Sequence, residues 1–345
     1  MDDRRPARAA QIKDVARLAG VSTATVSRTL SNPDIVSEDR RRAVLDAITT
    51  TGYSVNLSAR NLRRRRAGGV LAMAPNLANP FFSEILAGMS EALSAQGLNL
   101  IVADTQFGEG SRQQLVEYAD RSRADGLLLL DSSLDPVLFD RPQCPPVVQV
   151  CEEIGGLCAP RVVADNAGGM RAVVAHLVSL GHTRIGRVSG PARNSLTRDR
   201  EAGFCAGLRD ADLPRVPQWQ VEGRFSMESG RDAAARILAL DARPSAIVCD
   251  NDEMACGLMS ALIRRGLDIP ADMAVTGFDD IELSRHLTPS LTTVHQPRRR
   301  IGVQAVRQLL LAIDGAEMED RTSIPCTLAA RQSTLGAAWD GDSIP

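Results

Sequence analysis

The sequence predicts an α/β protein in which a small helical domain precedes a larger body of parallel sheets flanked by helices. Three observations carry this prediction. Apolar residues recur at helical spacing in three short blocks between Gln11 and Tyr53. From residue 70 to residue 335, short apolar strands alternate with amphipathic helices. A chain of 345 residues is also longer than one hydrophobic core usually organises, so we expect more than one domain.

Charge is distributed unevenly along the chain. The net charge is −2, yet residues 1–68 hold 14 Arg or Lys against 7 Asp or Glu, which leaves the remainder acidic. A basic segment ahead of an acidic body indicates a partner with fixed negative charge, nucleic acid or an anionic membrane, for that segment alone. The alternative is a solvated basic tail.

Cysteine usage and hydropathy argue against several classes of protein. The seven cysteines include no C-x-x-C pair, so we expect neither a disulfide framework nor a zinc site. The first residues, MDDRRPARAAQIKD, contain no apolar stretch that could serve as a signal peptide, and no run approaches the length of a membrane span. We therefore expect a cytoplasmic protein without metal or cofactor.

The first two helical blocks have the spacing of a helix-turn-helix. Gly20 permits a turn, and Ser22 can cap a second helix that runs from Thr23 to about Leu30. Val26 and Leu30 would face inward. The outer face then carries small or hydrogen-bonding residues suited to the major groove of DNA, namely Thr23, Ala24, Ser27 and Arg28.

A third helix is predicted after Ser37 and would close the small core through Val44, Leu45 and Ile48. Arg28 could make a bidentate contact to guanine. The alternative is a three-helix bundle that binds protein. The segment NLSARNLRRRRAGG, residues 56–69, follows with five arginines and little to bury, which is typical of a linker.

The body divides into two similar runs of strand and helix. The predicted strands are VLAMAP, LNLIVAD, GLLLLD and PPVVQV in the first run and IGRVSG, AIVCDN, MAVTGF and LTTVHQP in the second. Helices are expected over residues 82–96 and 111–123. Strict alternation favours parallel sheets with helices on both faces and two α/β subdomains with a cleft between them. Ligands of such sheets sit at the carboxyl ends of the strands.

The stretch VSTATVSRTLSNPDIVSEDRRRAVLDAITTTGYSVNLSARNL resembles the LacI/GalR family of bacterial repressors, and the resemblance continues to about Gly336. Within that family, VSTATVSR followed by NPD, NPFFSEI and PPVVQV is most similar to the cytidine repressor branch. The resemblance implies a homodimeric, effector-controlled repressor of pseudo-palindromic operators. Its body would be periplasmic-binding-protein-like. The implied divisions are a headpiece (1–54), a hinge (55–68), a body (69–335) and a polar tail (336–345).

Within the body, the resemblance implies an N-subdomain of about 69–165 with 296–322 and a C-subdomain of about 166–295 with 323–335. For DNA, Thr23, Ala24 and Arg28 match base-edge contacts of the family. Three further positions match phosphate or base-edge contacts: Ser22, Thr25 and Ser27. Four more match the hinge, where a leucine pair wedges into the minor groove: Tyr53, Asn56, Ala59 and Leu62. A single leucine in a linker is also unremarkable.

For the effector, a nucleoside or sugar, the resemblance points to six residues of the body: Phe81, Phe82, Arg200, Phe225, Asn251 and Asp279. The aromatic rings could stack on a ligand ring, and Arg200 with Asp279 could bind hydroxyl or carbonyl groups. The alternative is an Arg200–Asp279 salt bridge without a ligand. Cys151 stands where relatives often have Asp, which puts one polar contact in doubt.

Three rival functions remain. A solute-binding protein would share the body but not the basic headpiece. An enzyme would need a catalytic constellation, and the sequence has no G-x-S-x-G, P-loop, G-x-G-x-x-G or H-E-x-x-H motif. Asp279 and Asp280 are no acid/base pair, because neighbours on a strand point to opposite faces. The third rival is a repressor without effector control.

Overall fold

The computed structural model describes residues 10–53, 67–106, 115 and 117–339. Contacts within the chain group its residues into two units, Met1–Arg66 and Ala67–Pro345. The N-terminal unit holds α1 (Ile12–Leu18), α2 (Thr23–Ser31), a 3₁₀ turn (Pro33–Ile35) and α3 (Glu38–Thr51). The predicted three-helix headpiece is therefore confirmed. The hinge predictions at Asn56, Ala59 and Leu62 lie outside the described residues.

The headpiece core differs in part from the predicted one. Val15, Val26 and Val44 are fully buried, but Leu30 and Leu45 are 38% and 50% exposed. Ala47 is buried in their place, with Ile48 packed against the cluster. Three helices of this length bury only a narrow stripe of each helix, and the small Ala47 fits where two helices come close.

The first sheet of the body contains six parallel strands in the order β11-β5-β4-β3-β1-β2. Their bounds are β1 (Gly69–Ala74), β2 (Asn99–Asp104), β3 (Gly126–Leu129), β4 (Val147–Val150), β5 (Arg161–Ala164) and β11 (Arg321–Ile324). Two helices, α5 (Phe81–Ser94) and α12 (Arg298–Ile313), accompany it, with a 3₁₀ turn at Pro136–Leu138. The helix predicted over residues 111–123 falls largely outside the described residues.

The second sheet has the order β12-β10-β9-β8-β6-β7. Its strands are β6 (Ile185–Ser189), β7 (Gln220–Glu222), β8 (Ala246–Cys249), β9 (Ala274–Asp279), β10 (Thr292–His295) and β12 (Thr327–Ala329). The helices of this half are α7 (Asn166–Ser179), α8 (Ser195–Asp210), α9 (Met227–Leu238), α10 (Asp252–Ile263), α11 (Leu283–His286) and α13 (Gln332–Leu335), with 3₁₀ turns at Pro217–Trp219 and Gly336–Ala338.

One strand departs from the predicted parallel order. β12 pairs antiparallel with β10, whereas the other pairings of both sheets are parallel. The chain reaches β12 directly from β11 of the other sheet, so no helical crossover within the second sheet sets its direction. The chain passes between the sheets three times, after β5, after β10 and after β11. The third passage follows Ile324, slightly later than the predicted boundary near 322.

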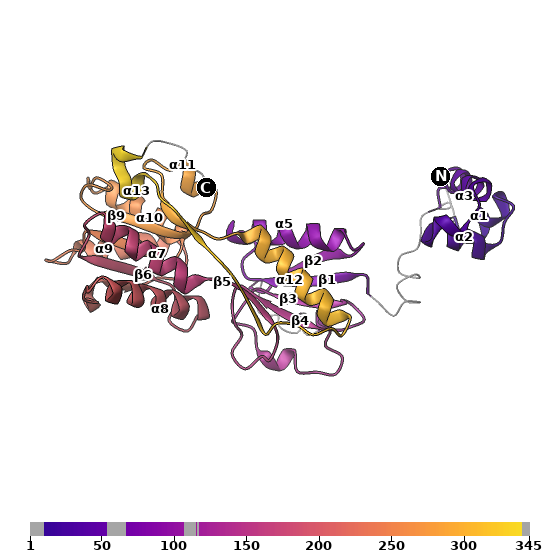
Figure 1. The fold of residues 1–345 in the computed structure, drawn as a ribbon, viewed down its shortest axis with the longest axis horizontal. Helices are drawn as coiled ribbons and strands as arrows, with labels where there is room; N and C mark the ends of the chain where they lie inside the picture. Colours follow the sequence, from indigo (N-terminus) through magenta and orange to yellow (C-terminus); the bar gives the residue numbers. More distant parts are fainter. Residues whose placement is uncertain (1–9, 54–66, 107–114, 116, 340–345) are drawn as a thin grey trace, which may run out of the picture. The chain divides into compact units, whose positions relative to one another are not determined.

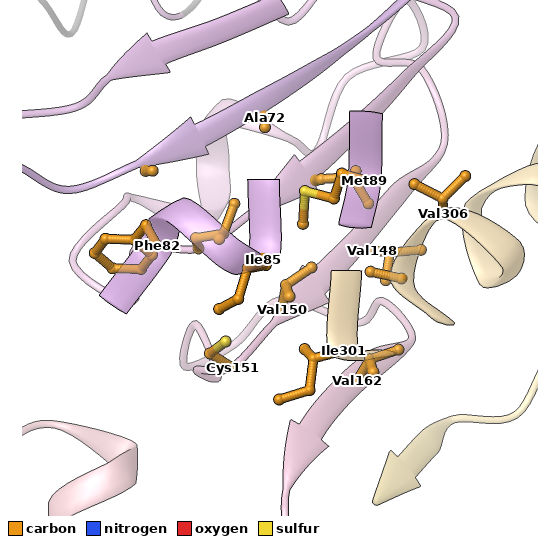
Figure 2. Close-up of a cluster of buried hydrophobic side chains, with 14 of the residues drawn as sticks. Ala72, Phe82, Ile85, Met89, Val148, Val150, Cys151, Val162, Ile301 and Val306 are labelled. Carbon is orange, nitrogen blue, oxygen red and sulfur yellow. The ribbon is translucent and has the colours of Figure 1, made fainter. Parts of the chain in front are cut away.

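The core of the first half lies between its sheet and the pair α5 and α12, which run side by side (Figure 1). Figure 2 shows Ile85 and Met89 of α5 and Ile301 of α12 pointing toward Val148 and Val150 of β4. These side chains are fully buried. A second cluster covers the opposite face of this sheet, and two further clusters cover the two faces of the second sheet.

Glycines set the distance between α5 and α12. A Cβ atom at Gly88 would lie 2.1 Å from the backbone oxygen of Arg299, and one at Gly302 would lie 2.1 Å from that of Ile85. Backbone atoms cannot yield as a flexible side chain can. The two helices therefore pack backbone to backbone along this contact.

We expect Gly88→Ala to lower the free energy of unfolding of the body by about 1–3 kcal/mol, because the added methyl group must push α12 away. Urea unfolding followed by tryptophan fluorescence measures this loss, since both tryptophans, Trp219 and Trp339, lie in the C-terminal unit, Ala67–Pro345. Ser90→Ala, on the exposed face of the same helix, is the matched control. Equal stability of Gly88→Ala and this control would contradict the close-packing account.

Candidate functional site

Helix α2 presents one buried and one exposed face. Val26 is fully buried, while Ser22, Thr23, Ala24 and Arg28 are exposed. Thr25 and Ser27 are half-buried between these faces. The structure therefore brings the six residues predicted on and before α2 to one region of the headpiece. Tyr53, the one described hinge residue, packs against the headpiece core and is only partly exposed.

The start of α2 is fixed by Ser22. Its hydroxyl accepts a hydrogen bond from the backbone N–H of Thr25 at 3.1 Å, and the two side-chain oxygens lie 2.9 Å apart. This cap satisfies a backbone donor of the first turn and holds both hydroxyls at the helix start. A helix start with free donors and a positive dipole end suits contact with phosphate. The surface has the residue types that read base edges beside those that hold a phosphate backbone.

The body contains a cavity of about 370 Å³, a volume typical of small-molecule sites. Both sheets contribute to its wall, and the contributing segments follow the carboxyl ends of β1, β3, β4, β6, β7, β8 and β9. This is the edge where open parallel sheets bind ligands. The six residues predicted to bind an effector all line it: Phe81, Phe82, Arg200, Phe225, Asn251 and Asp279.

Arg200 is 2% exposed and donates a hydrogen bond from each of its three guanidinium nitrogens. Its Nε donates to Oδ1 of Asn166 at 2.9 Å, one terminal nitrogen donates to the backbone oxygen of Asp250, and the other lies 3.5 Å from Oδ1 of Asp279. The guanidinium carbon also sits 3.9 Å from the ring centre of Phe278. The long contact to Asp279 is the weakest of these bonds. The salt bridge considered from the sequence exists, but it does not fill the cavity.

Asp279 ends β9 at the floor of the cavity and is 5% exposed. It accepts a hydrogen bond from Nε2 of Gln296 at 2.6 Å. Burial raises the pKa of Asp279 to about 6, although the charges of Arg200 and Arg298 oppose this. Its carboxylate is therefore poorly solvated and would gain from hydroxyl donors on a ligand.

Asn251 and the aromatic residues complete the predicted set. The Asn251 side chain caps α10 by accepting from the N–H of Met254 at 3.0 Å, and its amide donates to the backbone oxygen of Phe225 at 3.3 Å. Phe225 itself has a φ of 55°, a conformation that non-glycine residues rarely adopt. Phe81 and Phe82 meet edge to face with ring centres 5.2 Å apart. Both also belong to the core cluster, so only a small part of each ring borders the cavity.

Sequence reasoning missed the polar residues on the wall formed by the first sheet. Asp131 follows β3 and Glu152 follows β4, and Asn194, which precedes α8 in the second half, was missed as well. The signal was available in LLLLD and VQVCE, where a carboxylate comes directly after an apolar strand of a parallel sheet. Arg193 and Arg224 are exposed residues at the same cavity.

The position of Cys151 explains the missing aspartate. Its side chain is buried in the apolar cluster of the first sheet, and burial raises the pKa of its thiol (Figure 2). Glu152, one residue later, lies on the cavity side instead. The carboxylate of the next residue therefore borders the cavity at this turn.

Asp280 has a different environment from Asp279, as alternation along a strand predicts. Its carboxylate accepts from Arg331 at 2.6 Å, from Arg285 at 2.9 Å and contacts Nδ1 of His295 at 2.9 Å. Burial alone would raise the pKa of Asp280, but these hydrogen bonds outweigh it and hold the pKa far below its usual range. Asp280 thus joins β9, β10 and the C-terminal segment and does not line the cavity.

Residues 11–56 match the lacI family of bacterial regulatory proteins, and residues 174–334 match the periplasmic binding protein-like domain. The HTH-type transcriptional repressor CytR of Escherichia coli (strain K12) is 35% identical over 329 residues, which cover 94% of this chain and 96% of CytR. This chain belongs to the lacI family. The HTH-type transcriptional repressor PurR of Haemophilus influenzae (strain PittEE) is 36% identical over 335 residues, covering 94% of this chain and 98% of PurR. These identities are nearly equal, so the cytidine branch stays a prediction.

Solved structures of the lacI family agree with this assignment. The lac repressor dimer bound to operator and the anti-inducer ONPF superposes with a TM-score of 0.85 at 28% identity, covering 95% of this chain and 100% of that one. The transcriptional regulator CelR in complex with cellobiose gives 0.72 at 29% identity, covering 94% and 99%. This family member is a DNA-binding transcriptional regulator and not an enzyme. Among the described residues, no helix is long and apolar enough to cross a membrane, and no cluster of three or more acidic, His or Cys side chains could hold a metal ion.

We expect Asp280→Asn to lower the free energy of unfolding of the body by about 3 kcal/mol at pH 7, because it leaves the buried Arg331 without its counter-charge. The folded pKa lies below the unfolded one, so the stabilisation is fully present at neutral pH and is lost as the pH falls below about 4. Urea unfolding at pH 7 and pH 5 should therefore give the same difference from the unmodified protein.

Asp279→Asn, one residue earlier, is the matched control. Its carboxylate has a raised pKa, so the fold gains less from its charged form, although the buried Arg200 loses an acceptor 3.5 Å away. A larger loss for Asp279→Asn than for Asp280→Asn would contradict the separate roles given to the two residues.

Proposed function

We propose that this protein is a homodimeric repressor that binds a pseudo-palindromic operator in the cytoplasm and responds to a nucleoside or sugar held in the cavity of the body. The observation that carries the proposal is that both sheets supply polar side chains to one cavity, at the edge where such sheets bind ligands. A dimer doubles the DNA contact of a small headpiece, and a C₂ pair matches a palindromic site. The lac repressor dimer bound to operator supports the same arrangement here.

DNA binding is assigned to the exposed face of α2 and the start of that helix. Thr23, Ala24 and Arg28 read base edges, while Ser22, Thr25 and Ser27 contact phosphates or base edges. Tyr53, Asn56, Ala59 and Leu62 form the hinge, with Leu62 in the minor groove of the operator centre. Apolar wedges of this kind unstack a base step while nearby cations hold the phosphates.

The effector is assigned to Phe81, Phe82, Arg200, Phe225, Asn251 and Asp279. A ligand that touches both walls favours one degree of cleft closure and so changes the spacing of the two subunits' hinges. We propose that effector binding releases the operator. A solute-binding role does not account for the DNA-reading face of α2. An effector-independent repressor does not account for the polar cavity.

We expect Arg28→Ala to weaken binding to the preferred operator by 10- to 100-fold, since one bidentate base contact contributes about 1–3 kcal/mol of discrimination. The operator is first selected from a random duplex pool with the purified protein, and affinity is then measured by fluorescence anisotropy. Arg236→Ala removes the same charge from an exposed face of α9 in the body and serves as the control. Equal loss in both variants, or in neither, would contradict base reading by α2.

We expect a true effector at about 100 times its Kd to raise the free energy of unfolding by about 2.7 kcal/mol. A thermal-shift screen of the full chain against ribonucleosides, pentoses and hexoses measures this, and the hit is then added to the operator complex. Asp279→Asn should abolish the shift, since its amide no longer offers a carboxylate to ligand hydroxyls. Arg200 is a poorer test residue, because its replacement leaves buried partners unpaired. Release of DNA by a compound that Asp279→Asn still binds would place the effector elsewhere.

A further inference from the structure

We propose that the cavity accepts an uncharged ligand with neighbouring hydroxyl groups and excludes its phosphorylated or carboxylated relatives, because two carboxylates of the first sheet, Asp131 and Glu152, border it. The inference rests on the proposed function and narrows the ligand class of that same cavity. Its basis is the pair Asp131 and Glu152, which follow the neighbouring strands β3 and β4 and therefore lie at one edge of the sheet. Both line the cavity.

Asp131 is held rigidly as an acceptor. It is 5% exposed, and its Oδ1 accepts from the backbone N–H and the hydroxyl of Ser133 at 2.8 and 2.7 Å. Its Oδ2 accepts from the hydroxyl of Thr105. An ionised carboxylate offers about four acceptor positions and no donor. The three bonds from the protein orient the group and leave acceptor capacity that only a donor can satisfy.

Glu152 adds a second carboxylate to the same wall. Its Oε2 accepts from the backbone N–H of Ser132 at 3.1 Å. Burial and the nearby charge of Asp131 raise the pKa of Glu152, while hydrogen bonds from Ser132 and Asn194 oppose the rise. The raised pKa of Glu152 means that negative charge on this wall is already poorly stabilised. A ligand phosphate placed there would bring a further charge of the same sign into a partly desolvated space.

The arginines at the cavity do not neutralise the negative charge of this wall. Each of the three guanidinium nitrogens of Arg200 already donates within the protein, to Asn166, to the backbone of Asp250 and to Asp279, which leaves two of its five N–H groups. Arg224 is exposed and lies 3.6 Å from Asp232, and Arg193 is exposed as well. Exposed arginines bind anions weakly, because water screens them. The deep end of the cavity therefore offers acceptors to a ligand and little to an anion.

The remaining surface suits the rest of a nucleoside or sugar. Phe81, Phe82 and Phe225 give apolar contact for a ring, and Asn251 borders them. A ring with two adjacent hydroxyls could lie against the aromatic side while both hydroxyls donate to the carboxylates. A free base without hydroxyls would leave the buried acceptors unsatisfied, which sites of this kind penalise strongly.

The test compares matched ligands on the full-length protein by isothermal titration calorimetry. The probes are adenosine, cytidine, guanosine, uridine, ribose and glucose, each against its monophosphate, and each nucleoside against its 2′-deoxy form. We expect the best unphosphorylated ligand to bind at least tenfold more tightly than its phosphate and its deoxy form. We expect Glu152→Gln and Asp131→Asn each to reduce the discrimination against phosphate severalfold. Glu153→Gln, an exposed neighbour that pairs with Arg161 and does not line the cavity, should leave it unchanged.

The outcomes separate this inference from the proposed function. A phosphate that binds as tightly as its parent compound, or more tightly, overturns the inference while leaving effector control in place. Unchanged discrimination in both folded variants overturns the role of the two carboxylates. Binding by no member of either series overturns effector control by nucleosides or sugars, and the inference with it. The comparison of matched ligands on the unmodified protein needs no variant to fold.

Discussion

The burial of the Arg200 guanidinium is the constraint on which the body depends. A charge taken out of water must find partners on every side, because an isolated buried ion is costly. Arg200 finds them in three different segments, at Asn166, at the backbone of Asp250 and at Asp279. Asp250 is in turn held by the buried Arg187, whose Nε and terminal nitrogen donate at 2.7 and 2.8 Å. The carboxyl ends of β6, β8 and β9 are thereby fixed relative to one another.

The same network reaches the passages between the two sheets. Asn166 begins α7, directly after the chain leaves β5, and its amide donates to the backbone oxygen of Ala164 at 3.1 Å. Gln296, which donates to Asp279, lies in the passage from β10 to α12. Two of the three passages thus share one buried polar cluster with the cavity floor. Asn166 and Gln296 therefore connect these two passages to the residues at the floor of the cavity.

The sequence predicted the architecture because the signals were long and repeated. Eight strands and the helices between them were visible as apolar runs and periodic faces, whereas β5, β7, β11 and β12 were not. β7 and β12 span only three residues each, and the partly exposed β11 and β12 carry little of the apolar pattern that marks a central strand. Their pairing is set by neighbours far away in the chain. The same limit explains Leu30 and Leu45, whose exposure depends on how closely three helices approach one another.

The cavity was predicted unevenly for a related reason. Position-by-position resemblance found the residues of the second half, such as Arg200 and Asp279, because their motifs are intact. At Cys151 it left one polar contact in doubt, and the carboxylate of Glu152, the next residue, lines the cavity. A residue pattern does not show this, since it depends on which way each side chain points. The φ of 68° at Cys151 turns the backbone there, so that the thiol enters the apolar core while Glu152 faces the cavity.

Two pairs of adjacent residues in this fold each have one member held by contacts within the protein and one member at the cavity. Asp279 is poorly solvated, weakly paired and open to a ligand, whereas Asp280 is bound by two arginines and a histidine and locks the C-terminal segment to β9 and β10. Cys151 packs the core, and Glu152 serves the cavity. Cys151, Asp279 and Asp280 all have positive φ, so the backbone turns at both strand ends and directs adjacent side chains into different surroundings. The side chains of Asp280 and Cys151 are occupied by contacts within the protein. This leaves the carboxylates of Asp279 and Glu152 available to the cavity. A site built in this manner keeps unsatisfied acceptors in the cavity without loosening the sheets that position them.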